Sequence, residues 1–172
     1  YIYLNGNNIM ELNDGVFAGL PNLRQIDLSY NKFKELSGKP FAGANALTHI
    51  YLHYNNITSL DENVFAGLNN LTAIYLYNNK IERLSGGLFN GLNALTQIYF
   101  QSNNIKHVGL GIFDELILTH AYFQYNYCVN KYASNSNQQS FALIQHLETN
   151  CTDSELTTTT TMIPTTLETT ST

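Results

Sequence analysis

A short motif repeats along this chain in fixed register, and it restricts the fold more than any other feature of the sequence. The segment 51–57 reads YLHYNNI, and a shift of 24 residues gives YLYNNKI at 75–81. Related segments begin at Tyr3, Asp27 and Tyr99. A period in the twenties is typical of a solenoid, in which each coil stacks on its neighbours instead of surrounding a single core.

The repeated unit has a defined template when it is numbered from its first leucine. It reads L-x-x-L-x-L-x-x-N-x-I-x-x-L, followed by phenylalanine at position 19 and leucine at position 22. Positions 4 and 6 alternate with variable positions, so their side chains share the inner face of a short strand. Tyr1 already stands at position 3, so we expect the first coil to be truncated. Position 19 predicts a stacked aromatic spine of Phe17, Phe41, Phe65, Phe89 and Phe113.

Asparagine fills position 9 of every coil. We expect this side chain to be buried, so its amide needs hydrogen-bond partners inside the protein. Backbone groups of the same coil and of neighbouring coils can supply them. The column consists of Asn7, Asn31, Asn55, Asn79, Asn103 and Asn126.

The pattern over residues 1–127 resembles leucine-rich repeats of the typical 24-residue extracellular subtype. The resemblance implies an α/β solenoid: a curved horseshoe with a short parallel β-sheet on the concave face, and turns and short helices on the convex face. Members of this family commonly bind proteins or glycans through the concave face, in immune recognition, adhesion and guidance.

Three regions follow from the pattern: an array of about six repeats at 1–127, a C-terminal cap at 128–151 and a stalk at 152–172. Apolar residues at Phe141, Leu143, Ile144 and Leu147 have the spacing of an amphipathic helix laid over the end of the array. Cys151 lies just past this helix, so we expect a disulfide with Cys128, worth about 3 kcal/mol. A two-cysteine cap resembles the abbreviated caps of some invertebrate secreted repeat proteins.

The stalk region is rich in threonine, with an unbroken run at 157–161. This composition is typical of a disordered, O-glycosylated stalk, and an unmodified flexible tail is the alternative. A stalk commonly leads to a membrane anchor, which would lie beyond Thr172. We therefore expect a secreted or cell-surface protein.

The variable strand positions carry an unusual set of side chains. Tyrosine recurs at position 5, with Asp27 as the single acid there, and Tyr30, Tyr54 and Tyr125 follow at position 8. Phenylalanine in the core columns and tyrosine on the strands is the division expected when the strand face meets a partner. The predicted ligand-binding residues of this concave face are Asp27, His49, Tyr51, His53, Tyr75, Tyr77, Gln97, Tyr99, Gln101 and Tyr122.

A structural interpretation of the same tyrosines is open at this stage. Tyrosine has a high β-propensity, and neighbouring rings stabilise a sheet without any partner. Replacing Tyr51, Tyr75 and Tyr99 would separate the two interpretations, because only a binding surface would lose its partner.

The sequence predicts neither a catalytic site nor a cofactor or metal site. It contains no nucleophile elbow, phosphate-binding loop or HExxH motif. His49 and His53 would lie about 13 Å apart along a strand, which is too far to share a metal ion. The net charge of −5 argues against a nucleic-acid partner.

Two sequons fall in predicted turns, at Asn56 and Asn70, where an N-linked glycan is plausible in an extracellular protein. The sequence therefore predicts a monomeric, non-enzymatic extracellular module that recognises a protein or glycan in innate immunity or adhesion. The alternatives are a structural or matrix protein and a non-catalytic subunit of an enzyme complex.

Overall fold

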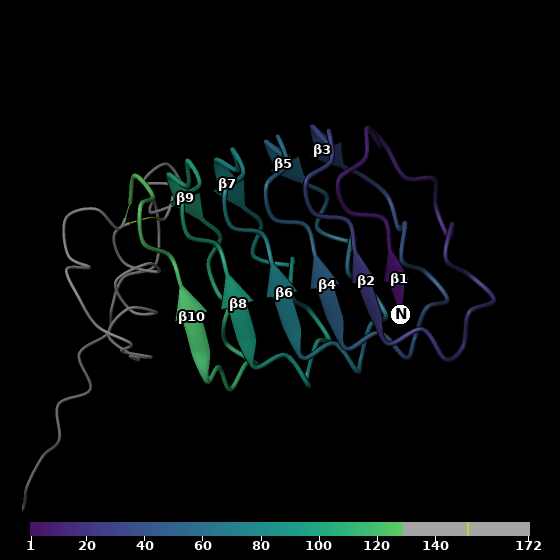
Figure 1. Ribbon diagram of the computed structural model, residues 1–172. Coiled ribbons are helices and arrows are strands. Elements are labelled where there is room, and N and C mark those ends of the chain that lie inside the picture. The colour runs from purple at the N-terminus through teal and green to yellow at the C-terminus, as the bar shows by residue number, and fades with distance from the viewer. Residues whose placement is uncertain (129–150, 152–172) are drawn as a thin grey trace, which may run out of the picture.

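The computed structural model describes residues 1–128 and Cys151, and these form a solenoid of stacked coils (Figure 1). One strand from each coil enters a six-stranded parallel sheet, so the sheet grows by one strand per repeat. In sheet order its strands are β1 (Ile2–Tyr3), β2 (Gln25–Asp27), β4 (His49–Tyr51), β6 (Ala73–Tyr75), β8 (Gln97–Tyr99) and β10 (His120–Tyr122).

The strands of this sheet pair in an unbroken register. Ile26 lies beside Ile50, which lies beside Ile74, and the same 24-residue step continues to Ile98. The last step is one residue shorter, since Ile98 pairs with Ala121. Constant register means that equal positions of successive coils form straight rows across the sheet.

Two smaller sheets lie along one edge of the array in Figure 1. One pairs β3 (Glu35–Leu36) with β5 (Ser59–Leu60), and the other pairs β7 (Arg83–Leu84) with β9 (His107–Val108). Each strand contains only two residues, at positions 13 and 14 of its coil.

The short helices expected on the convex face are absent from residues 1–128, so that part of the prediction is wrong. These segments are turns closed by single hydrogen bonds, such as Ala66 N–H to the Asn63 carbonyl and Leu71 N–H to the Leu68 carbonyl. Between them stands a glycine with left-handed φ, for example Gly67 at 82°. A right-handed helix cannot continue through such a residue, so each turn ends before it can extend into a helix.

The predicted phenylalanine column is confirmed as part of the core, with stacked rings at its N-terminal end and a pair tilted by 31° at its C-terminal end. All five side chains are buried, and stacked rings join Phe17 to Phe41 and Phe41 to Phe65, with centroids 5.8 and 6.2 Å apart. Phe89 and Phe113 are 6.3 Å apart nearer the C-terminal end. The buried apolar side chains of successive coils form one cluster, so the core is continuous along the array.

The asparagine column is confirmed as a hydrogen-bonded ladder between coils from Asn31 onward. The prediction is wrong for Asn7, which is exposed in the first coil and, among the described residues, donates only to carbonyls of that coil. Asn79 donates to the carbonyls of Leu76 in its own coil and Leu52 in the preceding coil, both at 3.0 Å. Its Oδ1 accepts the N–H of Ile57, also at 3.0 Å. Asn31, Asn55, Asn103 and Asn126 are buried and bonded in the same manner.

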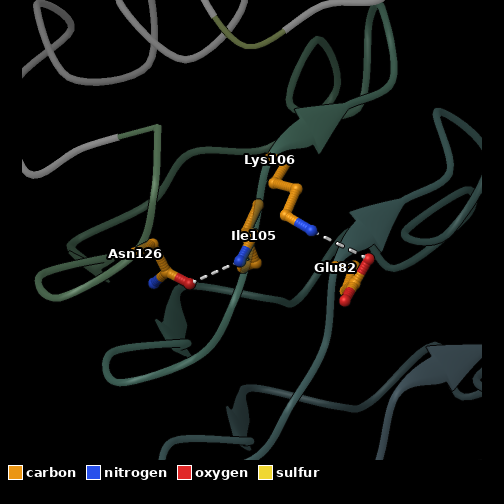
Figure 2. Close-up of polar contacts among 4 residues, drawn as sticks. All are labelled: Glu82, Ile105, Lys106 and Asn126. Atoms are coloured by element: carbon orange, nitrogen blue, oxygen red, sulfur yellow. Dashed lines mark hydrogen bonds and ion pairs between the residues drawn. The ribbon is translucent and has the colours of Figure 1, made fainter.

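Figure 2 shows the last rung of this ladder beside a surface contact. The Ile105 N–H donates to Asn126 Oδ1 at 2.9 Å. Lys106 and Glu82 form an exposed ion pair at 3.2 Å between adjacent coils. An exposed pair contributes little to stability, so the buried amides are the polar groups that fix the stacking of the coils.

The cap helix predicted at 140–147 and the stalk predicted at 152–172 lie outside the described residues. Among residues 1–128 and 151, no helix has the length and apolarity required to cross a membrane.

Candidate functional site

Four tyrosines at position 5 form a continuous stack across the sheet. The rings of Tyr51 and Tyr75 are 4.6 Å apart, those of Tyr75 and Tyr99 4.5 Å, and those of Tyr99 and Tyr122 5.1 Å. Their planes differ by no more than 18°. The ring spacing is close to the distance between strands, so the sheet itself holds the rings in contact. We call this row the tyrosine ladder.

A second aromatic cluster lies where the strands end, at positions 7 and 8. The rings of Tyr30 and Tyr54 stack at 4.5 Å, and those of His53 and Tyr77 stack at 4.4 Å. Tyr54 meets Tyr77 edge to face at 5.6 Å. The His53 ring also meets Tyr51 edge to face at 6.2 Å, which joins this strand-exit cluster to the tyrosine ladder.

The backbone at position 8 is left-handed in every coil from the second onward. The φ angles of Tyr30, Tyr54 and Tyr125 are 54°, 55° and 61°, and Asn78 and Ser102 occupy the same position with 55° and 56°. Such a φ costs a bulky side chain on the order of 1–2 kcal/mol. Tyrosine is therefore a costly choice at a position that asparagine occupies elsewhere in this chain.

Sequence reasoning placed these three tyrosines beside the strands but missed their backbone strain. A signal was present, since the first coil has glycine at this position, Gly6, with φ of 71°. Glycine and asparagine in one column indicate a left-handed residue. The three tyrosines are also well exposed, at 53%, 44% and 75% for Tyr30, Tyr54 and Tyr125.

Stacking determines which part of each ladder ring faces outward. Rings stacked along the row cover one another's faces, so the inner rings expose mainly their edges and hydroxyl groups. The ladder tyrosines are half-buried for this reason. The Tyr99 hydroxyl donates to Gln97 Oε1 at 3.1 Å, which brings a predicted glutamine into the same surface.

Burial controls the ionisation of this surface. It raises the pKa of Tyr75 to about 12, and the neighbouring Tyr51 and Tyr99 add to the shift. Burial also raises the pKa of Tyr77. The phenols therefore stay neutral hydrogen-bonding groups over the whole physiological range.

The two predicted histidines are set in the same surface. Burial lowers the pKa of His49, whose Nδ1 lies 2.9 Å from the Thr48 hydroxyl. Burial lowers the pKa of His53 as well, and the charge of Asp27 partly opposes this. His53 Nδ1 and Gln101 Oε1 are enclosed polar atoms without a hydrogen-bond partner among the described residues.

Asp27 takes a tyrosine's place in the position-5 row. Its Oδ1 accepts the backbone N–H of Ser29 at 2.9 Å and the Ser29 hydroxyl at 2.6 Å. Its charge also reaches its neighbours, because it contributes to the raised pKa values of Tyr51 and Tyr77. Asp27 therefore sets a negative potential at one end of the tyrosine ladder.

The sheet face contains no lysine or arginine at positions 3, 5, 7 or 8 of the described coils. The described residues also contain no group of three or more histidine, cysteine or acidic side chains that could hold a metal ion. The chemistry of the face is thus aromatic and hydrogen-bonding, with one fixed carboxylate.

The predicted glycosylation sites lie outside the strands. Asn70 is exposed, and its side-chain nitrogen donates to the Asn45 carbonyl at 2.9 Å, while Asn56 is half-buried. Cys128 and Cys151 are free in this structure, and the Cys128 thiol donates to the Lys106 carbonyl at 2.7 Å. The Val108 N–H donates to the Cys151 carbonyl at 2.7 Å, so Cys151 borders the last coil. The disulfide stays a prediction.

Comparison with known proteins agrees with this architecture. A search of curated proteins found no match. Among solved structures, the chain is similar to TLR13 in a crystal structure of its complex with ssRNA13, with a TM-score of 0.68 and 29% identity. The similarity covers 72% of this chain but only 18% of the TLR13 chain, so this chain spans less than a fifth of that length. The family model described as leucine rich repeat matches residues 1–57, 46–105 and 70–120. The chain belongs to the leucine-rich repeat family.

Proposed function

We propose that this chain is the recognition module of a secreted or cell-surface protein, and that it binds a protein ligand through the tyrosine ladder and the strand-exit cluster. Innate immune recognition or adhesion is the context that the family and the TLR13 similarity favour. The proposed role is binding, with no catalytic step.

One observation carries the proposal: tyrosine occupies the left-handed position 8 three times. High β-propensity accounts for tyrosine within a strand, but it does not account for tyrosine at a residue with positive φ. Strain of this kind is typical of functional positions. Tyr30 and Tyr54 accept that strain and present a stacked, exposed pair of rings beside the ladder.

The stacking supports a protein ligand over a glycan. A sugar ring binds an aromatic side chain by lying on its face, and both faces of the inner ladder rings, Tyr75 and Tyr99, are covered by neighbouring rings. The accessible edges and hydroxyl groups suit the polar and apolar atoms of a protein surface, as in tyrosine-rich antibody loops.

The charge of the face supports a protein over a nucleic acid. The solved TLR13 structure is a complex with single-stranded RNA. Nucleic-acid binding relies on lysine and arginine against phosphates, and the sheet-face positions of the described coils carry none. Asp27 would repel a phosphate placed near the end of the ladder.

The test compares the wild type with the triple variant Y51S/Y75S/Y99S on three panels: secreted and surface proteins, glycans, and single-stranded RNA. We expect a protein ligand whose binding is lost in the triple variant, while urea unfolding of that variant stays cooperative. A matched control is N45S/N69S/N93S, which changes three exposed turn residues of one repeat column.

Ligand binding that survives the triple variant would overturn the proposal and would favour a structural or matrix role for the array. Ladder-dependent binding on the glycan or RNA panel alone would overturn the choice of a protein ligand.

A further inference from the structure

The position-5 row of the sheet has one interruption. Strand register places Asp27 between Tyr3 on β1 and Tyr51 on β4. Every other described residue of this row is a tyrosine. We call the space between the Tyr3 and Tyr51 side chains, with Asp27 at its base, the Asp27 gap.

The spacing of the rows gives this gap a defined width. Adjacent ladder rings lie 4.5 to 4.6 Å apart, about one strand spacing. Tyr3 and Tyr51 are two strands apart, which corresponds to about 9.6 Å. One planar group held between two rings at van der Waals contact needs roughly 7–8 Å. The Asp27 gap therefore has room for one such group and not for a stack of two.

The carboxylate at the base of the gap is held in place but not neutralised. Both Ser29 bonds go to Oδ1, and Ser29 is 2% exposed, so they fix the orientation of the carboxylate. Among residues 1–128 and 151, Asp27 has no ion-pair partner and no hydrogen bond to its second oxygen. A fixed, unneutralised carboxylate between aromatic side chains favours a cation.

We propose that the Asp27 gap is a subsite for the guanidinium group of an arginine on the protein ligand. This inference rests on the proposed function and specifies the chemistry of the ligand at one end of the face. A guanidinium is planar, stacks on aromatic faces and donates to a carboxylate at the same time. An ammonium group of lysine can pair with Asp27 but cannot lie flat between two rings.

The geometry also explains why the gap differs from the rest of the row. Inside the ladder both faces of each ring are taken by neighbours, whereas Tyr51 has a tyrosine on its β6 side and the small Asp27 on its β2 side. Tyr3 is 71% exposed, so its ring is accessible to a ligand. The gap is thus where the position-5 row offers a ring face as well as edges.

A direct test uses N-acetyl-arginine methylamide as the probe, with the citrulline and lysine analogues as controls, in NMR titrations of the full chain. We expect saturable shifts at Tyr3, Ser29 and Tyr51 with roughly millimolar affinity for the arginine probe. The lysine analogue should bind more weakly and the neutral citrulline analogue should give no saturable shift. In D27N the affinity should fall roughly tenfold to a hundredfold.

The variant Y3S provides a second measurement, since it removes one wall of the gap at an exposed residue and leaves the carboxylate in place. It should weaken arginine binding more than lysine binding. The control D114N, at an exposed acid away from the sheet face, should change neither. Equal shifts with arginine and citrulline, or unchanged arginine binding in D27N, would overturn the subsite.

A random peptide library displayed on phage distinguishes this inference from the proposed function. Selection on the wild type should enrich arginine-containing peptides, and D27N should remove the arginine preference. Ladder-dependent peptides with no arginine preference would overturn the subsite and leave the proposed function standing. Peptides that bind independently of the tyrosine ladder would count against both.

Discussion

Tyr54 lies with its ring 4.5 Å from that of Tyr30, and both residues have a left-handed backbone. Both residues stand at position 8 of adjacent coils, and this position gives them the strained backbone and also brings their rings together. A strained residue that also stacks should contribute little net stability, since a stacking gain of about 0.5–1.5 kcal/mol is opposed by a similar strain.

The variant Y54N tests this balance. Asparagine tolerates positive φ and already occupies the position in the next coil as Asn78. We expect the free energy of unfolding to change by less than about 1 kcal/mol, while ligand binding falls. Urea denaturation and a binding assay measure the two effects. A loss well above about 1 kcal/mol in Y54N would show that Tyr54 is structural.

The buried asparagines should contribute far more to stability than any exposed one. In N79A the Ile57 N–H loses its partner, and the carbonyls of Leu52 and Leu76 each lose one of two amide donors. The unsatisfied buried N–H costs about 1–3 kcal/mol and each lost carbonyl bond about 0.5–1.5 kcal/mol, so we expect a loss of at least about 2 kcal/mol in urea unfolding. The control N69A changes an exposed asparagine of the preceding coil and should be neutral. Equal effects from the two variants would contradict the ladder.

The raised pKa of Tyr75, about 12, predicts a loss of stability at alkaline pH. The unfolded chain ionises this tyrosine near its ordinary pKa, whereas the folded chain keeps it protonated until higher pH. Stability should therefore decline as pH rises from about 10 toward 12. The absorbance of tyrosinate should show a late-ionising group that disappears in Y75F. Simultaneous ionisation of all tyrosines in the folded protein would refute the prediction.

The lowered pKa of His53 predicts an opposite effect at acid pH. Below the ordinary histidine pKa, near 6.5, the unfolded chain binds a proton that the folded chain resists. This contribution to stability is complete above that pH and is lost as pH falls through the folded pKa. We expect H53Q to flatten the dependence of the urea midpoint on pH between about 7 and 5. If the pH dependence of the urea midpoint is unchanged in H53Q, other groups cause it, and H49Q is the next variant to measure.

The predicted disulfide between Cys128 and Cys151 is tested by oxidation. Closing a loop of this length should raise the free energy of unfolding by about 3 kcal/mol relative to the reduced protein. Thiol titration of the unfolded chain reports whether the bond has formed, and C128S/C151S is the control. A shift in the urea midpoint upon reduction that persists in this double variant would contradict the assignment.

Much of this architecture could be predicted because the same structural position recurs in every coil. A column such as Phe17 to Phe113, or Asn31 to Asn126, samples the same environment in successive coils, so a fixed residue type reveals burial or a fixed hydrogen bond. The tyrosine ladder followed in the same way, since in-register parallel strands bring Tyr51, Tyr75 and Tyr99 together.

Features that depend on backbone angle and on ring orientation were harder to predict. The convex helices failed because a glycine such as Gly67 is left-handed where a helix would need to continue. The Asp27 bond to Ser29 has a local sequence signal, since aspartate commonly accepts the N–H two residues on. No sequence signal showed that neighbouring tyrosine rings cover each other's faces. That arrangement depends on side-chain rotamers, which strand pairing selects.

The asparagine ladder has a consequence for how such a protein can change over generations. Each amide bonds only to its own coil and the preceding one, so an inserted or deleted coil of 24 residues restores every bond at the new junction. Gain or loss of whole coils would lengthen or shorten the row of tyrosines in steps of one ring while the remaining contacts persist. The extent of the proposed binding surface can therefore change by whole coils while the contacts inside the remaining coils stay the same.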